Sequence, residues 1–262
     1  MEFKLLPGGT INGEARVPGD KSMSHRSIML GALAEGTTRV TGFLEGEDAL
    51  ATLGAFRAMG VEIERKGKGE VVVHGVGLHG LKAPTEDLDL GNAGTGMRLM
   101  CGLMAGQPFD TVLTGDASLC SRPMGRVIDP LKLMGAQIDS EEGGRPPLKV
   151  SGGSQLQGIH YDLPMASAQV KSCVLLAGLY AQGRTSVTEP APTRDHTERM
   201  LRGFGYPVQR DGEVISLEGG GRLAATDIDV PADISSAAFF LVAASIAPGA
   251  DRECGPKARH FC

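Results

Sequence analysis

The 262-residue sequence contains no tryptophan, and aromatic residues make up only 4% of it. Few aromatic rings leave little surface for base stacking, and a formal net charge of −5 gives no general attraction for nucleic acid or an anionic membrane. The most apolar stretch, SSAAFFLVAASIA (235–247), is too short to span a bilayer, and the N-terminal MEFKLLPGGT lacks the basic start and apolar core of a signal peptide. We therefore expect a cytoplasmic protein with no nucleic-acid and no membrane partner.

Paired cysteines and the common phosphate-binding motifs are also missing. The five cysteines are odd in number and show no paired spacing, which predicts reduced thiols, with Cys101 and Cys173 as small core residues. A P-loop is excluded because Asp20 separates Gly19 from Lys21, and GNAGTG (91–96) has its glycines in the wrong order for a dinucleotide fingerprint. We expect no metal site.

The chain instead repeats one plan, a short strand, a turn of small residues and an apolar helix that ends at glycine. It occurs four times, at 15–36, 88–106, 161–183 and 228–249. Each of the first three copies is followed by a β-rich run, then by an amphipathic helix with a new strand, and then by a closing strand. The segments that hold the amphipathic helix and the new strand are 47–64, 122–139 and 193–209. The unit is β-α-β-α-β-β and occurs three times.

These repeats predict an α/β (α+β) fold in one compact lobe, with helices inside and sheets around them. Residues 28–34 and 172–181 are apolar on nearly all faces, so we expect both helices to be buried. The fourth copy starts correctly, but ADRECGPKARHFC (250–262) has neither the alternation nor the second helix of the other copies. We interpret the chain as a first lobe (15–227), a remnant of a second lobe (1–14 and 228–250) and a non-matching tail (251–262); a solvated tail is the alternative.

Basic and hydroxyl side chains gather where the repeated helices begin. In VPGDKSMSHRS (17–27) we expect the helix to start near Ser22, with Lys21 at its rim and Arg26 one turn inside. Helix N-termini attract anions, and arginine and lysine bind phosphate in complementary ways. The alternative is a capped helix with solvated surface charges.

Two further helix starts repeat this pattern. GNAGTGMR (91–98) combines three glycines with Arg98, and MASAQVKS (165–172) offers Ser167, Gln169 and Lys171. Arg122 stands directly before a proline at an expected helix start, and Arg194 takes a similar place in PTRDH (192–196). Because three repeated units bring these ends to one face, we expect a site for a substrate with more than one anionic group.

The motifs PGDKSMSHRS, LGNAGTGMR, GDASLCSRPMGRV, MASAQVKS and EPAPTRDHTERML closely resemble those of the 5-enolpyruvylshikimate-3-phosphate synthases, the enolpyruvyl transferases of the shikimate pathway. The resemblance runs from about residue 4 to residue 250. It implies two lobes of three β-α-β-α-β-β units each, with substrates bound between them. It also implies transfer of the enolpyruvyl group of phosphoenolpyruvate to the 5-hydroxyl of shikimate 3-phosphate, with release of phosphate and no cofactor.

The resemblance also implies roles for residues. Shikimate 3-phosphate would be bound by Lys21, Ser22, Arg26, Ser167, Ala168 through its backbone, and Arg194. Phosphoenolpyruvate would be bound by Lys21, Gly94, Arg122 and Gln169. The family's acid and base residues would lie beyond residue 249, so no catalytic residue is assigned. In this family glyphosate occupies the phosphoenolpyruvate site, and an alanine in place of Gly94 would crowd it.

Two other functions remain open at this point. The sister family that transfers enolpyruvyl to UDP-N-acetylglucosamine carries a reactive cysteine several residues before an Arg-Pro pair, whereas Cys120 lies only two residues before Arg122. A chain with one lobe is also compatible with a substrate-binding half-enzyme, or with a non-catalytic phosphosugar-acid binding module. A complementing second lobe is the expected protein partner.

Overall fold

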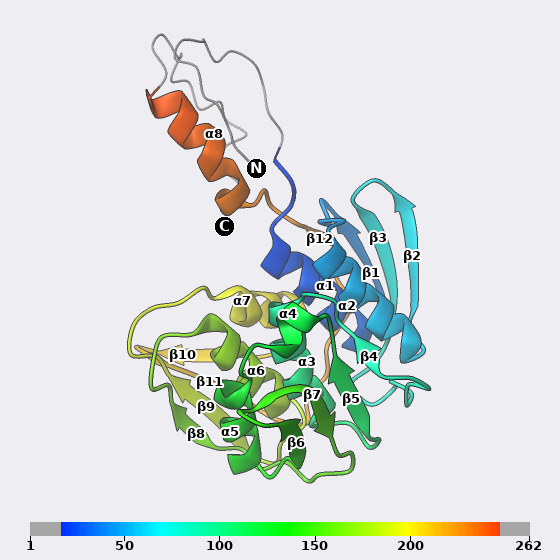
Figure 1. Ribbon diagram of the computed structural model, residues 1–262, viewed down its shortest axis with the longest axis vertical. Coiled ribbons are helices and arrows are strands. Elements are labelled where there is room, and N and C mark those ends of the chain that lie inside the picture. The colour runs from blue at the N-terminus through cyan, green and yellow to red at the C-terminus, as the bar shows by residue number, and fades with distance from the viewer. Residues whose placement is uncertain (1–16, 247–262) are drawn as a thin grey trace.

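The computed structural model describes residues 17–246. The predictions for residues 1–14 and 251–262 lie outside this range. Within it, the chain forms eight helices (Figure 1): α1 (Lys21–Leu33), α2 (Glu47–Ala58), α3 (Gly94–Met104), α4 (Ala117–Cys120), α5 (Gly125–Leu133), α6 (Ala168–Gly178), α7 (His196–Gly203) and α8 (Ile234–Ile246).

The strands of this part of the chain form three four-stranded sheets. The first, in the order β12-β1-β3-β2, contains β1 (Glu35–Thr41), β2 (Glu62–Gly67), β3 (Glu70–Val76) and β12 (Ile228–Asp229). The second, in the order β4-β5-β7-β6, contains β4 (Leu88–Asp89), β5 (Thr111–Thr114), β6 (Ile138–Glu141) and β7 (Arg145–Val150). The third, in the order β10-β11-β9-β8, contains β8 (His160–Asp162), β9 (Arg184–Thr188), β10 (Gln209–Asp211) and β11 (Val214–Glu218).

All three sheets share one topology. A short edge strand runs parallel to its neighbour (β4 with β5, β8 with β9, β12 with β1), and the other two strands continue the sheet in antiparallel fashion. A helix links each of the parallel pairs β4–β5 and β8–β9, as expected for a parallel crossover. The predicted repeat and the α/β class are therefore confirmed.

The first sheet departs from the prediction in one respect. Its parallel edge strand is β12, paired through Val40 with Ile228 and Thr41 with Asp229, whereas the sequence predicted a strand at the start of the copy 15–36. Val17, the described part of that predicted strand, lies outside any strand, and the bridge from Gly19 to Ala232 runs antiparallel. Residues 228–229 therefore join the first sheet, although the sequence analysis assigned them to the second-lobe remnant. Repeat similarity alone does not reveal which copy of a strand fills a shared edge.

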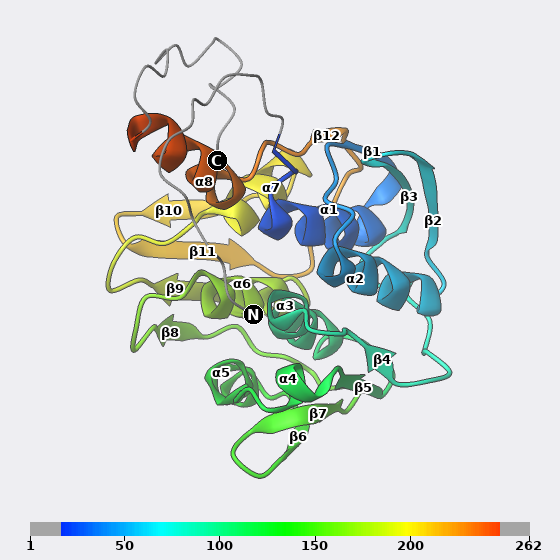
Figure 2. The ribbon, with the colours of Figure 1, turned by 45° about the horizontal axis from the view of Figure 1, so that its top comes forward.

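The core lies between the sheets and is built on α1, α3 and α6 (Figure 2). Every residue from Ser24 to Leu33 in α1 and from Val170 to Gly178 in α6 is buried, which confirms the prediction of two inner helices. Cys101 and Cys173 are also buried free thiols, as predicted. α3 packs directly against α6, while α2 and α7 pack against α1 and α5 packs against α6.

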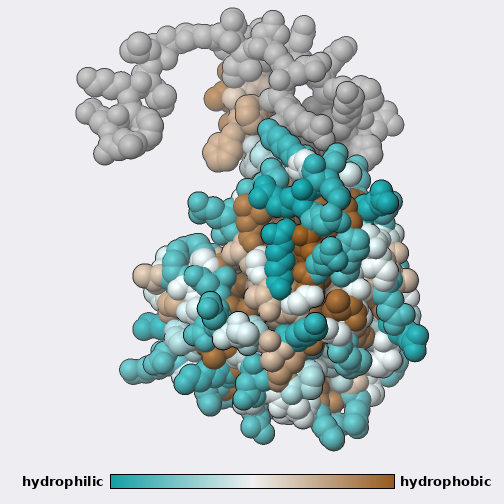
Figure 3. Space-filling model, turned by 90° about the vertical axis from the view of Figure 1, so that its right-hand side faces the viewer, coloured by the Kyte–Doolittle hydropathy of each residue, from teal (hydrophilic) through white to brown (hydrophobic). Residues whose placement is uncertain are grey.

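Helix α8 stands apart from this core (Figure 1). Its large apolar side chains are exposed, including Phe239 at 80% and Ile246 at 77%. Figure 3 shows an apolar patch near the top of the molecule, where α8 lies in Figure 1. Hydrophilic side chains predominate on the side formed by β2 and β3. No helix within residues 17–246 has the length and apolar character needed to cross a membrane.

Candidate anion-binding site

The three inner helices begin in different ways. The Asp20 carboxylate caps α1 by accepting a hydrogen bond from the Met23 amide at 2.7 Å, and the Ser167 hydroxyl caps α6 by accepting one from the Val170 amide at 3.3 Å. Helix α3 begins after Ala93, which offers no side-chain cap. The first amides of a helix lack internal partners and carry partial positive charge. The N-terminus of α3 is therefore the one of these three whose amides are not taken by a side chain.

Two arginines, Arg98 and Arg122, lie at this N-terminus, and the charge of a third, Arg126, acts on Arg98. Arg98 lies one turn inside α3, Arg122 lies in the loop between α4 and α5, and Arg126 lies in the first turn of α5. The pKa of Arg98 is lowered first by its partial burial and then by the positive charges of Arg122 and Arg126. The arginine–carboxylate ion pairs formed within residues 17–246 belong to other arginines: Arg65, Arg199 and Arg222. Positive charge is thus concentrated here in a chain of net charge −5, and no carboxylate of the described residues forms an ion pair with it. The nearby Asp116 feels this charge, because its pKa is lowered first by hydrogen bonds from Asn92 and Leu119 and then by Arg122.

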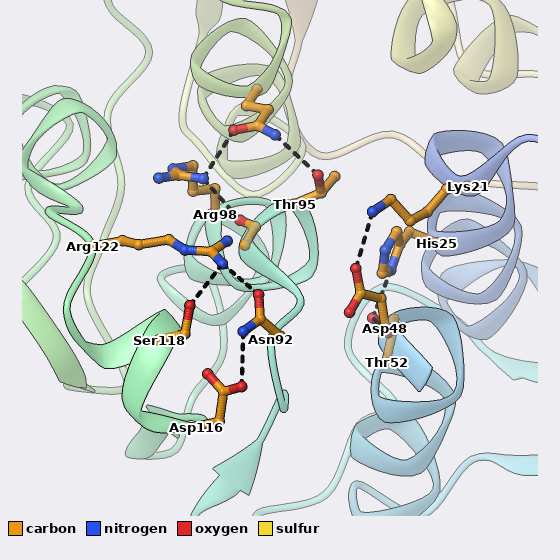
Figure 4. Close-up of polar contacts among 12 residues, drawn as sticks. Lys21, His25, Asp48, Thr52, Asn92, Thr95, Arg98, Asp116, Ser118 and Arg122 are labelled. Carbon is orange, nitrogen blue, oxygen red and sulfur yellow. Dashed lines mark hydrogen bonds and ion pairs between the residues drawn. The ribbon is translucent and has the colours of Figure 1, made fainter. Parts of the chain in front are cut away.

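Neutral side chains hold Arg122 in place. Its Nη2 donates to the amide oxygen of Asn92 and to Ser118 Oγ, the latter at 3.2 Å (Figure 4). Asn92 in turn donates to Asp116 Oδ2 at 2.7 Å, and the other oxygen of Asp116 caps α4. Asp116 therefore orients Asn92 rather than neutralising the guanidinium directly.

Gln169 connects the beginnings of α6 and α3. Its amide nitrogen donates to Thr95 Oγ1 at 2.9 Å, and its amide oxygen accepts from Arg98 Nη1 at 3.1 Å. Gly94 stands directly between the guanidinium groups, because a methyl group added there would lie 3.0 Å from Arg122 Nη1 and 3.1 Å from Arg98 Nη1. The small residue at this position therefore keeps the approach to both arginines open.

A second cationic group, Arg26, is buried beside α6. Its Nε donates to Thr197 Oγ1 at 2.7 Å, its Nη1 to the Ser22 carbonyl at 2.9 Å and its Nη2 to Ser172 Oγ at 2.8 Å. Burial lowers the pKa of Arg26 to about 10, against the raising effect of Glu198 and Asp20. The side chain therefore stays protonated at neutral pH, and all three of its hydrogen-bond acceptors are neutral.

Lys21 lies at the N-terminus of α1 and faces α2. Its Nζ is 3.1 Å from Asp48 Oδ2, and the side chain is half exposed. Behind it, His25 Nδ1 is hydrogen-bonded to Thr52 Oγ1 at 2.8 Å. In the view of Figure 4, Lys21 lies on the opposite side from Arg98 and Arg122, with Thr95 between. A surface ion pair of this kind is weak, so Lys21 can exchange Asp48 for a stronger anion at small cost.

The structure connects five of the predicted site residues, namely Arg26, Ala168, Gln169, Gly94 and Arg122, through neighbouring contacts, whereas Lys21 pairs with Asp48 outside this set. Ser172 accepts from Arg26 and donates to the Ala168 carbonyl at 2.6 Å; Gln169 follows Ala168 and contacts Arg98, which leads to Gly94 and Arg122. Arg194 is exposed in the loop before α7, where its charge helps to lower the pKa values of Arg26 and His196. Substrate contacts of these residues stay predictions.

Helix α1 begins at Lys21, next to Ser22 as expected, because Asp20 caps it. Two other expectations about local structure are corrected. Arg122 does not precede a helix directly, because α5 begins only at Gly125. Lys171, expected at the opening of α6, is 0% exposed and points into the core, where Glu198 Oε1 lies 2.7 Å and Glu189 Oε1 3.0 Å from its Nζ.

Sequence reasoning missed the residues that orient the cations. Thr197, Ser172, Asn92 and Ser118 contact Arg26 or Arg122, but they carry no charge and the sequence analysis singled out none of them individually. Only the spacing of Ser172, four residues after Ala168 on the same helix, hinted that its hydroxyl could reach that carbonyl. The contact of Thr197 with Arg26 joins residues 171 positions apart, which a local pattern cannot reveal.

The chain is similar to known proteins over nearly its whole length. It is 70% identical over 251 residues to the 3-phosphoshikimate 1-carboxyvinyltransferase of Alkalilimnicola ehrlichii, covering 96% of this chain and 56% of that protein. The enzyme of the same name from Methylococcus capsulatus is 68% identical over 249 residues, covering 95% of this chain and 57% of that protein. This chain therefore spans a little over half the length of these curated relatives.

Solved structures agree with these sequence relatives. The EPSP synthase of Acinetobacter baumannii superimposes with a TM-score of 0.87 at 66% identity, over 92% of this chain and 55% of that one. The profile of the family described as EPSP synthase (3-phosphoshikimate 1-carboxyvinyltransferase) matches residues 5–252. The resemblance noted in the sequence is thus confirmed, and the chain belongs to the EPSP synthase family.

Proposed function

We propose that this chain supplies the substrate-binding half of an enolpyruvyl transferase. In the reaction, the 5-hydroxyl of shikimate 3-phosphate adds to C2 of phosphoenolpyruvate, and elimination then releases inorganic phosphate. The observation that carries the proposal is the uncapped N-terminus of α3, with Arg98 and Arg122 at it, the charge of Arg126 acting on Arg98, and no ion-pairing carboxylate among the described residues.

The two cationic groups of the candidate site, one at the N-terminus of α3 and one at Arg26 beside α6, suit two different anions. The uncapped helix and Arg122 would bind phosphoenolpyruvate, with Gly94 leaving room and Gln169 beside it. Arg26 would bind the phosphate of shikimate 3-phosphate together with Ser22, Ser167, the Ala168 backbone and Arg194. Lys21 would lie between the two ligands and contact both.

These groups also supply part of the chemistry. Phosphate leaves with increasing negative charge, and preorganised guanidinium groups stabilise such charge without reorganisation. The reaction also needs a base for the hydroxyl and an acid that protonates the methylene carbon. His25 does not suit either role, because burial lowers its pKa to about 4 and its side chain is 0% exposed. We assign acid and base to the part of the family's sequence that this chain does not match.

This chain covers only part of the length of its relatives, and this limits the activity that we propose for it. Because the chain matches only about 56% of their length, we propose that it binds shikimate 3-phosphate by itself, with little or no turnover, and that a complementing second lobe restores catalysis. Glyphosate would compete with phosphoenolpyruvate at Gly94. A cytoplasmic location fits phosphorylated substrates and the free thiols at Cys101, Cys120 and Cys173.

The test combines binding and turnover. The purified 262-residue chain is titrated calorimetrically with shikimate 3-phosphate and, as a matched control, with shikimate, which lacks the phosphate. Phosphate release from both substrates is then followed with the chain alone and with the chain mixed with the part of the Alkalilimnicola ehrlichii enzyme that this chain does not cover. We expect preference for the phosphorylated ligand and phosphate release only in the mixture.

Two results would contradict this function. Equal affinity of the chain for shikimate and shikimate 3-phosphate would contradict the proposed phosphate site. Full turnover by the chain alone would contradict the assignment of the acid and the base to a second lobe. Binding with preference for the phosphate but no phosphate release in the mixture would favour the non-catalytic binding module.

A further inference from the structure

A buried cluster of charges lies beneath the candidate site. Lys171 on α6 is 0% exposed, and Glu189, which follows β9, and Glu198 on α7 are 1% and 2% exposed. Lys171 Nζ lies 3.0 Å from Glu189 Oε1 and 2.7 Å from Glu198 Oε1. Glu189 also accepts a hydrogen bond from Thr193, in the loop that carries Arg194. None of these three charged groups reaches the surface where substrate would bind.

The cluster is linked to Arg26 through neighbouring residues. Ser172 follows Lys171 in α6, and Thr197 precedes Glu198 in α7. The hydroxyls of Ser172 and Thr197 are hydrogen-bonded at 2.7 Å, and both accept from the Arg26 guanidinium. Helices α6 and α7 are therefore joined by two parallel side-chain contacts, one between hydroxyls and one between Lys171 and Glu198.

Within this arrangement the Glu198 carboxylate is close enough to compete with a bound phosphate for Arg26. Glu198 follows the residue that accepts from Arg26 Nε, and its charge is the largest influence that raises the pKa of Arg26 against burial. Yet the hydrogen bonds of Arg26 go to two hydroxyls and one carbonyl, while Glu198 pairs with Lys171. A guanidinium that formed a buried pair with a carboxylate would have to break it before binding phosphate, which is costly where both groups are desolvated.

We propose that Lys171 is a positioning residue that holds Glu198 away from Arg26, so that Arg26 keeps its charge for the phosphate of the substrate. The inference rests on the proposed function and adds a residue that the substrate does not touch. It also explains why a lysine beside a helix start points inward. A purely structural clamp would instead join α6, α7 and the end of β9, and breaking it from either side would loosen the hydroxyls of Ser172 and Thr197 that hold Arg26.

The test uses volume-conserving variants of the 262-residue chain. Lys171→Met leaves Glu198 without its partner and free to pair with Arg26. We expect the affinity for shikimate 3-phosphate to fall about tenfold, the size of one charge-assisted hydrogen bond, with the affinity for shikimate unchanged. In Lys171→Met/Glu198→Gln the competing charge is gone, and the ratio of the two affinities should return to that of the unsubstituted chain.

The ratio of affinities separates recognition from folding, because a smaller folded fraction lowers the apparent affinity for both ligands equally. Should Lys171→Met fail to fold, Glu198→Gln alone decides: removing a competitor does not lower the ratio, whereas removing half of a structural clamp lowers it. An unchanged ratio in Lys171→Met, a double variant that stays low, or a lowered ratio in Glu198→Gln would overturn the proposal. Absence of any preference for phosphate in the unsubstituted chain would instead count against the proposed function.

Discussion

The guanidinium groups of Arg98 and Arg122 both lie close to Gly94, which has no side chain. A single substitution at Gly94 therefore tests whether this open space is needed for binding. In Gly94→Ala the added methyl would lie 3.0 Å from Arg122 Nη1 and 3.1 Å from Arg98 Nη1, both ends of flexible side chains. The guanidinium groups can move aside, so we expect little change in the free energy of unfolding. Affinity for phosphoenolpyruvate and glyphosate, measured by calorimetry on the chain, should fall because the methyl occupies the approach to both arginines.

Gly125 provides the matched control for Gly94. It begins α5 in the same arginine-rich segment, and a methyl group added there meets no atom within 4 Å. Gly125→Ala should therefore leave both affinities unchanged. Equal losses in the two variants would show that the effect does not come from crowding at Gly94.

His25 is expected to make the stability of the fold depend on pH. Burial lowers its pKa from 6.5 to about 4, partly opposed by Asp48 and reinforced by the charges of Arg26 and Lys21. The folded state therefore favours neutral imidazole: this stability is complete above pH 6.5 and is lost as pH falls toward 4, by about 2 kcal/mol at pH 5.

Urea unfolding at pH 7 and pH 5 measures this contribution. Carboxylates titrate in the same range, so the comparison is between the unsubstituted chain and His25→Gln, which cannot gain the proton. The loss of unfolding free energy between the two pH values should be smaller in the variant by about 2 kcal/mol. Equal losses would show that His25 titrates normally.

At the scale of elements, the close approach of α3 to α6 organises both the core and the site. A methyl group added at Gly102 on α3 would lie 2.3 Å from the Cys173 carbonyl oxygen on α6, so the helices would have to separate. We expect Gly102→Ala to lower the free energy of unfolding by about 2–3 kcal/mol. Because Gln169 and Thr95 lie at the beginnings of these helices, anion affinity should fall too.

Gly54 on α2 is the control for this helix contact. It faces open space within an α-helix, so alanine there adds helix propensity and should stabilise the chain by about 0.5–1 kcal/mol. Thermal unfolding of the two variants should therefore shift in opposite directions. Destabilisation by Gly54→Ala would show that helix propensity does not govern the exposed position.

At the scale of the whole molecule, α8 presents apolar surface to water. Phe239, Val242 and Ile246 are 80%, 58% and 77% exposed, and their spacing places them along one side of the helix. Contiguous apolar surface of this kind drives association. We expect the chain to form concentration-dependent oligomers, detected by size-exclusion chromatography with light scattering.

Substitutions on α8 test the source of this association. Phe239→Asp/Val242→Asp should shift the chain toward the monomer. Leu133→Asp on α5 replaces a single apolar side chain that is 66% exposed and should not. A monomer at high concentration before any substitution would contradict the prediction.

The sequence by itself determined the repeated unit and the two buried helices, because both follow from local periodicity. Helices that are apolar on every face have to be inside, and a strand-helix pattern that recurs three times predicts the same sheet three times. Three cations of the site could also be found, since Lys21, Arg26 and Arg98 stand at recognisable helix starts.

Only the tertiary structure decided which charges remain available to a ligand. Lys171 and Arg26 are both basic residues near a helix start, but Lys171 is neutralised by two glutamates distant in sequence, whereas Arg26 is held by hydroxyls and a carbonyl. The pairing of β12 with β1, which joins residues distant in the sequence, was likewise decided only by the tertiary structure. Whether a charge is free depends on partners that the fold brings together, and local sequence does not contain them.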